Sequence, residues 1–175
     1  MMRKYLVTIL FVPLLSCTQQ ESKMANTPSY FDVAQYFESE ASRLQKVNPT
    51  VIKHVVAVGQ KEQKATKIAD WKTELASFVN SDINKAAWAG EFTVAKNGNT
   101  TSYSTNNAKI PVKKVEVTVL GEKITGVKIF KTTNNYLYKS TDTLLYYPDS
   151  LYFIQNLQKV KLLSSKNYSV TGKLK

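Results

Sequence analysis

The apolar residues between Pro28 and Val47 recur at every third or fourth position, which is the spacing of one face of an α-helix. Pro28 at a first helical position and the capping pattern of Ser29 and Asp32 predict that the helix begins there. Asn48-Pro49 predicts its end. The apolar face, which we expect to lie in the core, consists of Phe31, Ala34, Phe37, Ala41, Leu44 and Val47.

A hairpin and a second helix are predicted next. Residues 51–58 and 61–69 flank Gly59-Gln60, a pair suited to a tight turn between two strands. Asp70 can cap a second helix, and Gly90 lies just beyond its end. The apolar stripe of this helix consists of Trp71, Leu75, Phe78, Val79 and Ile83.

In the second half of the chain the hydrophobic period changes to two, which is typical of β-strands with one buried face. Asn97-Gly98 is a strong hairpin signal, and Gly121-Glu122, Asn134-Asn135 and Pro148-Asp149 mark further turns. Residues 150–157 fit either a strand or a single helical turn. The pattern therefore predicts a series of strands joined by short connections.

A last hairpin is predicted from residues 158–162 and 168–174, with a turn at 164–167. The order is thus helix, hairpin, helix and a meander of about six strands, and its short connections favour antiparallel neighbours. This order predicts a single α+β domain over residues 28–175. We expect two helices packed on one face of a mostly antiparallel, curved meander sheet, with the other face in water.

The start of the chain has a different composition. Arg3-Lys4 precedes the apolar stretch 5–15, which has the length of a secretory signal and is too short to span a bilayer of about 30 Å. Leu14-Leu15-Ser16-Cys17 follows and resembles the lipobox of bacterial lipoprotein precursors. The resemblance implies removal of a signal peptide of 16 residues and acylation, including palmitate, of Cys17. Residues 17–27 then form a lipidated cysteine and a flexible tether.

Further resemblances concern location and architecture. Thr18 stands where the best-known sorting system uses Asp for inner-membrane retention, which implies the outer membrane, with the membrane face left open. The signal and the segment from Trp71 to Trp88 look like small envelope lipoproteins of the Bacteroidota, and this likeness implies no activity. Helices on a curved sheet are similar to periplasmic lipoprotein carriers. Asp142-Thr143-Leu144 and Asp149-Ser150-Leu151 resemble an O-glycosylation acceptor of the same bacterial group.

The charge of the chain is uneven. The net charge is +11, and residues 96–175 hold 13 basic against 4 acidic side chains, whereas residues 17–95 hold nine of each. The predicted meander therefore carries a positive field. Predicted export and the lack of an aromatic and basic RNA-binding pattern exclude nucleic acid. Anionic lipid or glycan remains as the expected partner, beside the alternative of a basic surface without one, and the oligomeric state is open.

Candidate contacts follow from strand alternation, because successive side chains point to opposite faces of a sheet. Residues 136–153 hold six of the 19 aromatic side chains. Tyr147 and Phe153 are predicted on the face away from the helices, where they could stack on sugar rings or contact an apolar ligand, while packing in the core is the alternative. The lysines predicted to contact an anionic partner are Lys113, Lys128, Lys131, Lys159, Lys161 and Lys173.

The sequence offers little catalytic chemistry. His54 is the only histidine and Cys17 the only cysteine, so a catalytic triad or a two-histidine metal site within one chain would need His54. Its place in the run Val51–Val56 favours an ordinary polar strand position. Glu40 and Glu74 are expected to be solvated on the helices, although carboxylates brought together in space could serve a hydrolase. We expect no enzyme, metal or cofactor.

These patterns together predict a lipid-anchored module of the cell envelope that binds or scaffolds an unidentified ligand. Its expected partners are the membrane, through the N-terminal lipid, and an anionic lipid or glycan. A carrier of an apolar ligand or of a lipoprotein is the first alternative, by architecture alone. A carboxylate-dependent hydrolase is the second alternative.

Overall fold

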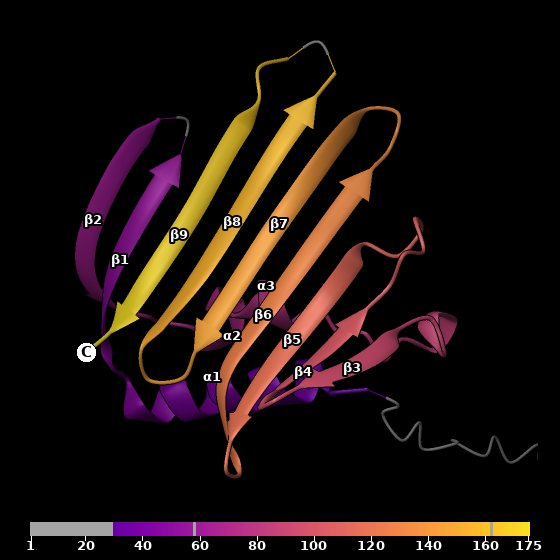
Figure 1. Cartoon of the computed structure of the whole chain (residues 1–175). Coiled ribbons are helices and arrows are strands. Elements are labelled where there is room, and N and C mark those ends of the chain that lie inside the picture. The colour runs from indigo at the N-terminus through magenta and orange to yellow at the C-terminus, as the bar shows by residue number, and fades with distance from the viewer. Residues whose placement is uncertain (1–29, 58, 162) are drawn as a thin grey trace, which may run out of the picture.

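The computed structural model describes residues 30–57, 59–161 and 163–175, so Cys17 and the predicted helix start at Pro28 lie outside the described residues. The dominant feature of the protein is an open nine-stranded sheet with antiparallel neighbours throughout, in the order β2-β1-β9-β8-β7-β6-β5-β4-β3 (Figure 1). This sheet, with a few helices, confirms the predicted mostly antiparallel α+β architecture. The strands are β1 Thr50–Ala57, β2 Gln60–Lys67, β3 Thr93–Asn97, β4 Thr100–Ser104, β5 Val112–Leu120, β6 Lys123–Asn134, β7 Tyr138–Tyr147, β8 Leu151–Val160 and β9 Lys166–Leu174.

The first helix, α1, extends over Val33–Val47. It begins after Asp32, whose carboxylate accepts a hydrogen bond from the backbone N–H of Gln35 (2.8 Å). The helix therefore begins later than the capping pattern predicts, because Asp32 itself is the cap. Asn48 ends it in the left-handed conformation (φ 50°), and its N–H donates to the carbonyl of Leu44 (2.8 Å).

The second predicted helix is wrong as one continuous element. The structure instead has two one-turn helices, α2 Trp71–Glu74 and α3 Ala76–Val79, and a 3₁₀ turn, η1 Ala86–Trp88. Asp70 caps α2 as predicted, and its hydrogen bonds from the Thr73 side chain and backbone lower the pKa of the Asp70 carboxyl.

The composition after Val79 explains why this segment does not continue as a helix. Asn80, Ser81 and Asp82 carry short polar side chains that compete with the backbone for hydrogen bonds and disfavour a helix interior. Asp82 accepts from the backbone N–H of Asn84 (3.3 Å) in such a local contact. Short polar residues therefore end the helical segment before Ile83, the last residue of the predicted stripe.

The meander over residues 93–174 follows the predicted turns, and residues 151–160 form a strand rather than a helical turn. The last strand, β9, pairs with β8 on one side and with β1 on the other. The pairing of β1 with β9 extends from Val51 opposite Leu174 to Ala57 opposite Tyr168. The N-terminal hairpin thus joins the sheet only through the last strand of the chain.

The core lies between the sheet and the helices. Tyr146 on β7 and Tyr152 on β8 are directly opposite each other and fully buried. Phe37 of α1 stacks on Phe78 of α3 at 4.5 Å between ring centroids and meets Tyr146 at 5.2 Å. Trp71 of α2 lies 6.1 Å from Tyr152. The three helices therefore contact the same face of the sheet, and the other face is called the helix-free face below (Figure 1).

One predicted core position is wrong. Val47 continues the apolar stripe of α1 but is 61% exposed, because the helix ends at this residue and no element lies over it. Val33, in contrast, is fully buried although the stripe did not include it. Both differences from the predicted core follow from the bounds of α1, which begins at Val33 and ends at Val47.

Gly172 marks the closest approach within the core. It lies directly opposite Tyr152 across the β8–β9 pair. A Cβ atom at residue 172 would lie 2.1 Å from Cε1 of Tyr152, well inside van der Waals distance. The tyrosine ring therefore lies on the glycine backbone, and this packing requires a residue without a side chain.

Candidate functional site

Two tyrosine–glutamate–cation contacts connect the helices to the sheet, and they are the most polar feature of the core. In the first, the Tyr146 hydroxyl donates to Oε2 of Glu40, and Arg43 donates to both carboxylate oxygens of Glu40 (2.8 and 2.9 Å). Arg43 also contacts Oδ1 of Asp149 (2.9 Å). Burial and the bond to Glu40 raise the pKa of Tyr146. Glu40 is therefore a bound anchor of α1 rather than a solvated charge.

The second contact has the same arrangement of tyrosine, glutamate and cation, and its glutamate lies on α2. The Tyr152 hydroxyl donates to Oε1 of Glu74, and Lys53 on β1 donates to Oε2 (2.8 Å). Burial and the bond to Glu74 raise the pKa of Tyr152. The expectation that Glu40 and Glu74 are solvated is thus wrong, because each accepts from a buried tyrosine and a cation. Sequence spacing could not show this, because the partners are far apart along the chain.

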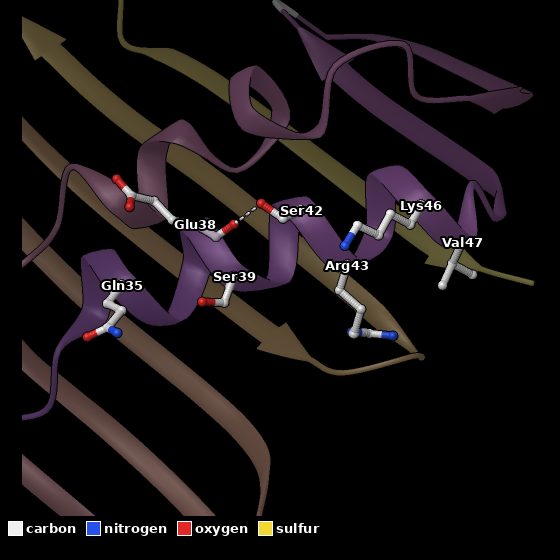
Figure 2. A pocket seen from close by; sticks show the side chains of 7 residues that line it. All are labelled: Gln35, Glu38, Ser39, Ser42, Arg43, Lys46 and Val47. Atoms are coloured by element: carbon white, nitrogen blue, oxygen red, sulfur yellow. Dashed lines mark hydrogen bonds between the residues drawn. The ribbon is translucent and has the colours of Figure 1, made fainter.

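Two surface hollows border α1. A cleft of about 440 Å³ lies between α1 and two hairpin turns, lined by Tyr36, Glu40, Arg43, Glu122, Lys123, Ile124, Pro148 and Asp149. Burial, then the charge of Glu40, raises the pKa of Tyr36 there. A shallow groove lies along α1 itself, and Figure 2 shows that exposed Gln35, Glu38 and Ser39 contribute to it. In the first hollow Tyr146 and Arg43 bind Glu40, Arg43 contacts Asp149, and Glu122 is exposed in the β5–β6 turn. The side chains of the second hollow face solvent.

The helix-free face carries an apolar patch made of two directly opposite residue pairs on β7 and β8. Leu145 lies opposite Phe153, and Tyr147 lies opposite Leu151. The pairs are neighbours on one face because alternate residues of a strand point the same way. All four side chains are partly exposed, and together they form a continuous apolar surface. These four residues are called the apolar patch below.

Three of the six predicted lysines lie on the helix-free face. Lys128 on β6 is opposite Leu145, and Lys173 on β9 is opposite Leu151, so a lysine stands on each side of the apolar patch. Lys159 lies further along β8. The structure therefore brings Tyr147 and Phe153 together with Lys128 and Lys173 on one surface.

The other three predicted lysines do not join this surface. Lys131 is three residues from Lys128, so strand alternation places it on the helix side, where Nζ lies 3.8 Å from Oδ2 of Asp142. Lys113 occupies a β-bulge and donates to a backbone carbonyl in the preceding loop (2.7 Å). Lys161 follows β8, and its Nζ lies 4.4 Å from the ring centroid of Tyr136.

His54 lies on the helix-free face, opposite Gln63 and Thr171. It is partly buried on a strand with neighbours on both sides. In the part of the chain that the structure describes, no three His, Cys, Asp or Glu side chains gather where they could hold a metal ion. Of the two residues in the O-glycosylation patterns, Ser150 is exposed in a turn and Thr143 lies within β7.

Sequence reasoning missed one group of exposed residues. Tyr136 lies in the β6–β7 connection and is 83% exposed. Leu137 beside it is 65% exposed. The signal was present, because Asn134-Asn135 predicts a turn and a turn residue need not alternate with the strand.

Comparisons with known proteins leave the family open. The chain matches no protein-family model, and no curated protein and no solved structure is significantly similar to it. No helix within the described ranges combines the length and the hydropathy needed to cross a bilayer. The surface of the described residues is therefore the remaining guide to function.

Proposed function

We propose that this chain is a lipid-anchored module of a bacterial cell envelope that binds an acidic glycan on the helix-free face of its sheet. The lipid is attached at Cys17, and the outer membrane is the proposed location. The observation that carries the glycan proposal is the apolar patch between Lys128 and Lys173. Its rings at Tyr147 and Phe153 can pack on the C–H face of a sugar, and the lysines can pair with sugar carboxylates.

Binding is favoured over catalysis by what surrounds the carboxylates. Glu40 and Glu74 each accept hydrogen bonds from a buried tyrosine and from a cation. A general base needs a free lone pair within reach of substrate, and these oxygens are already engaged. Their role is structural, and it supports a module without an active site on the helix side.

The carrier alternative is less well supported. A carrier needs apolar space between the helix layer and the sheet, whereas Phe37 is in ring contact with both Phe78 and Tyr146. Between α1 and α3 the hollow lined by Ala41, Val79 and their neighbours measures about 100 Å³. A ligand pocket for an apolar molecule is several times larger.

The test measures retention of the detergent-solubilised full-length chain in native gels that contain polygalacturonate or neutral dextran. We expect retention by polygalacturonate only, and we expect it to weaken at high salt because charge contributes. Phe153→Ala and Lys128→Glu should each weaken apparent binding about fivefold or more, equivalent to about 1 kcal/mol.

Two control variants test whether a charge reversal or the loss of a ring weakens binding at any position of the sheet. Lys123→Glu changes the same charge at the start of β6, and Tyr168→Ala removes an exposed ring from the other face of the sheet. Both should retain wild-type mobility. Equal mobility of the wild type in the two gels would refute the glycan proposal, as would equal losses in the patch variants and these controls.

A further inference from the structure

Three of the most exposed apolar side chains of the described residues gather at one end of the sheet. Tyr136 is 83%, Leu137 65% and Leu163 64% exposed. They lie in the β6–β7 and β8–β9 connections, at the end of the strands away from α1 (Figure 1). We call this end the sheet tip, and it consists of Tyr136, Leu137, Lys139, Lys159, Lys161, Leu163 and Lys166.

Hydrogen bonds hold the two connections side by side. The N–H of Lys161 donates to the carbonyl of Leu137 (3.0 Å), which ties one connection to the other. The side-chain oxygen of Asn135 accepts from the N–H groups of Leu137 and Tyr138 (both 2.9 Å). The exposed apolar side chains thus lie on two connections that are held together by hydrogen bonds, at the end of the sheet away from α1 (Figure 1).

The charge at the sheet tip has one sign. Residues 134–141 and 155–168 contain four lysines and no acidic residue. The ammonium group of Lys161 lies 4.4 Å from the Tyr136 ring, so cation and aromatic group face the same region. Excess positive charge at this end contributes to the charge asymmetry of the chain.

The opposite end of the sheet provides the contrast. Leu120 at the end of β5 is also 65% exposed, but Glu122 in the following turn is close to it, and the neighbouring β7–β8 turn carries Asp149. Exposed leucine occurs at both ends, whereas exposed apolar residues surrounded only by lysine occur at the sheet tip. The two ends therefore differ in charge more than in hydrophobicity.

We propose that the sheet tip docks on the surface of an anionic lipid bilayer. Tyr136, Leu137 and Leu163 enter the interface between head groups and acyl chains, where aromatic and aliphatic side chains are favoured. The four lysines contact the anionic head groups, and their apolar stems reach along the buried residues. The sheet then stands end-on to the membrane and leaves the helix-free face accessible. This inference uses other residues than the apolar patch and holds or fails independently of the glycan proposal.

The first experiment measures binding to vesicles of equal parts phosphatidylcholine and phosphatidylglycerol, and to vesicles of phosphatidylcholine alone. The chain lacks residues 1–17, so that neither an acyl chain nor the apolar stretch 5–15 contributes, and all variants share this background. Lys161→Glu should weaken binding to the anionic vesicles at least about fivefold, the effect of losing one lysine near such a surface. Leu137→Asp should weaken it by a similar factor or more. Lys123→Glu and Leu120→Asp are the matched controls at the opposite end and should bind as the background does.

The second experiment locates the contact and does not depend on overall affinity. Cys17 is the only cysteine, so in the chain without residues 1–17 Leu137→Cys and Leu120→Cys each provide a single site for an environment-sensitive fluorophore. With anionic vesicles we expect a blue shift and brighter emission at residue 137 and unchanged emission at residue 120. Unchanged emission at both positions, the same change at both, or absence of vesicle binding would overturn the proposal. Loss of polygalacturonate retention with intact vesicle contact would refute the glycan proposal only.

Discussion

Gly172→Ala is the most demanding single test of the packing between helices and sheet. The added methyl group would lie 2.1 Å from Cε1 and 2.2 Å from Cζ of Tyr152, whereas ordinary contacts begin at 3.4 Å. The ring therefore has to move by more than 1 Å. Tyr152 is fully buried, touches Trp71, and donates to Glu74, so the movement disturbs all of these contacts.

The expected loss of stability has two parts. Overpacking a well-filled core costs about 1–3 kcal/mol. Losing a hydrogen bond from a buried hydroxyl to a charged group costs about 1.5–3 kcal/mol. Because the two parts overlap when the ring moves as a unit, we expect the free energy of unfolding to fall by about 3–5 kcal/mol.

Urea unfolding of the full-length chain, followed by circular dichroism, measures this change. Gly126→Ala is the control, because its Cβ would lie 3.3 Å from a Tyr147 ring that is partly exposed and can move, at a cost below about 1 kcal/mol. In a Tyr152→Leu background the cost of Gly172→Ala should fall by more than about 1 kcal/mol. If Gly172→Ala and Gly126→Ala agreed within about 0.5 kcal/mol, the proposed ring-on-glycine packing would be refuted.

Three further predictions concern the anchor, the core and the histidine. Cys17→Ala should leave the precursor uncleaved and unacylated, as palmitate labelling in the producing cells would measure. Phe37→Ala and Leu75→Ala should each lower the free energy of unfolding by about 2–5 kcal/mol, because both side chains are fully buried. His54→Gln should leave polygalacturonate retention intact, because His54 lies on β1, and β9 separates β1 from β8 and the apolar patch.

Each of these predictions has an outcome that contradicts it. Palmitate labelling that persists in Cys17→Ala would remove the lipoprotein interpretation. An unchanged unfolding midpoint in Phe37→Ala or Leu75→Ala would mean that the helices do not pack as described. A loss of more than about 100-fold in any activity later measured for His54→Gln, the scale expected for removing a general base, would overturn the interpretation as a binding module.

The sequence predicted the sheet better than the helices. Strand alternation and turn signals such as Asn97-Gly98 depend on residues that are close along the chain, and the observed hairpins follow them. The Asp70 cap and the apolar stripe from Trp71 to Ile83 predict one helix. The stripe residues Trp71 and Phe78 are buried in two separate one-turn helices with buried Leu75 between them. Apolar spacing registers neither this break nor the short polar residues that follow Val79.

The candidate site was predictable only in part. Alternation placed Tyr147 and Phe153 on the helix-free face, and the same rule separates Lys131 from Lys128 once the strand register is known. The contacts of Glu40 and Glu74 could not be predicted, because they depend on which helix lies over which strand. Pairing across such distances leaves no periodic signal in a single sequence.

The pairing of β1 with β9 has a consequence for how the chain reaches its native state. β1 and β2 come first among the described strands, yet β9, the described strand that attaches this hairpin to the rest of the sheet, comes last among them. Contacts between residues so distant in sequence slow folding, because a long loop must close before they form. A polypeptide that lacked β9 would expose the backbone edges of β1 and β8 together, and open edges of this kind recruit other chains. Pairing of β9 with both β1 and β8 is therefore the step that closes these two edges during folding.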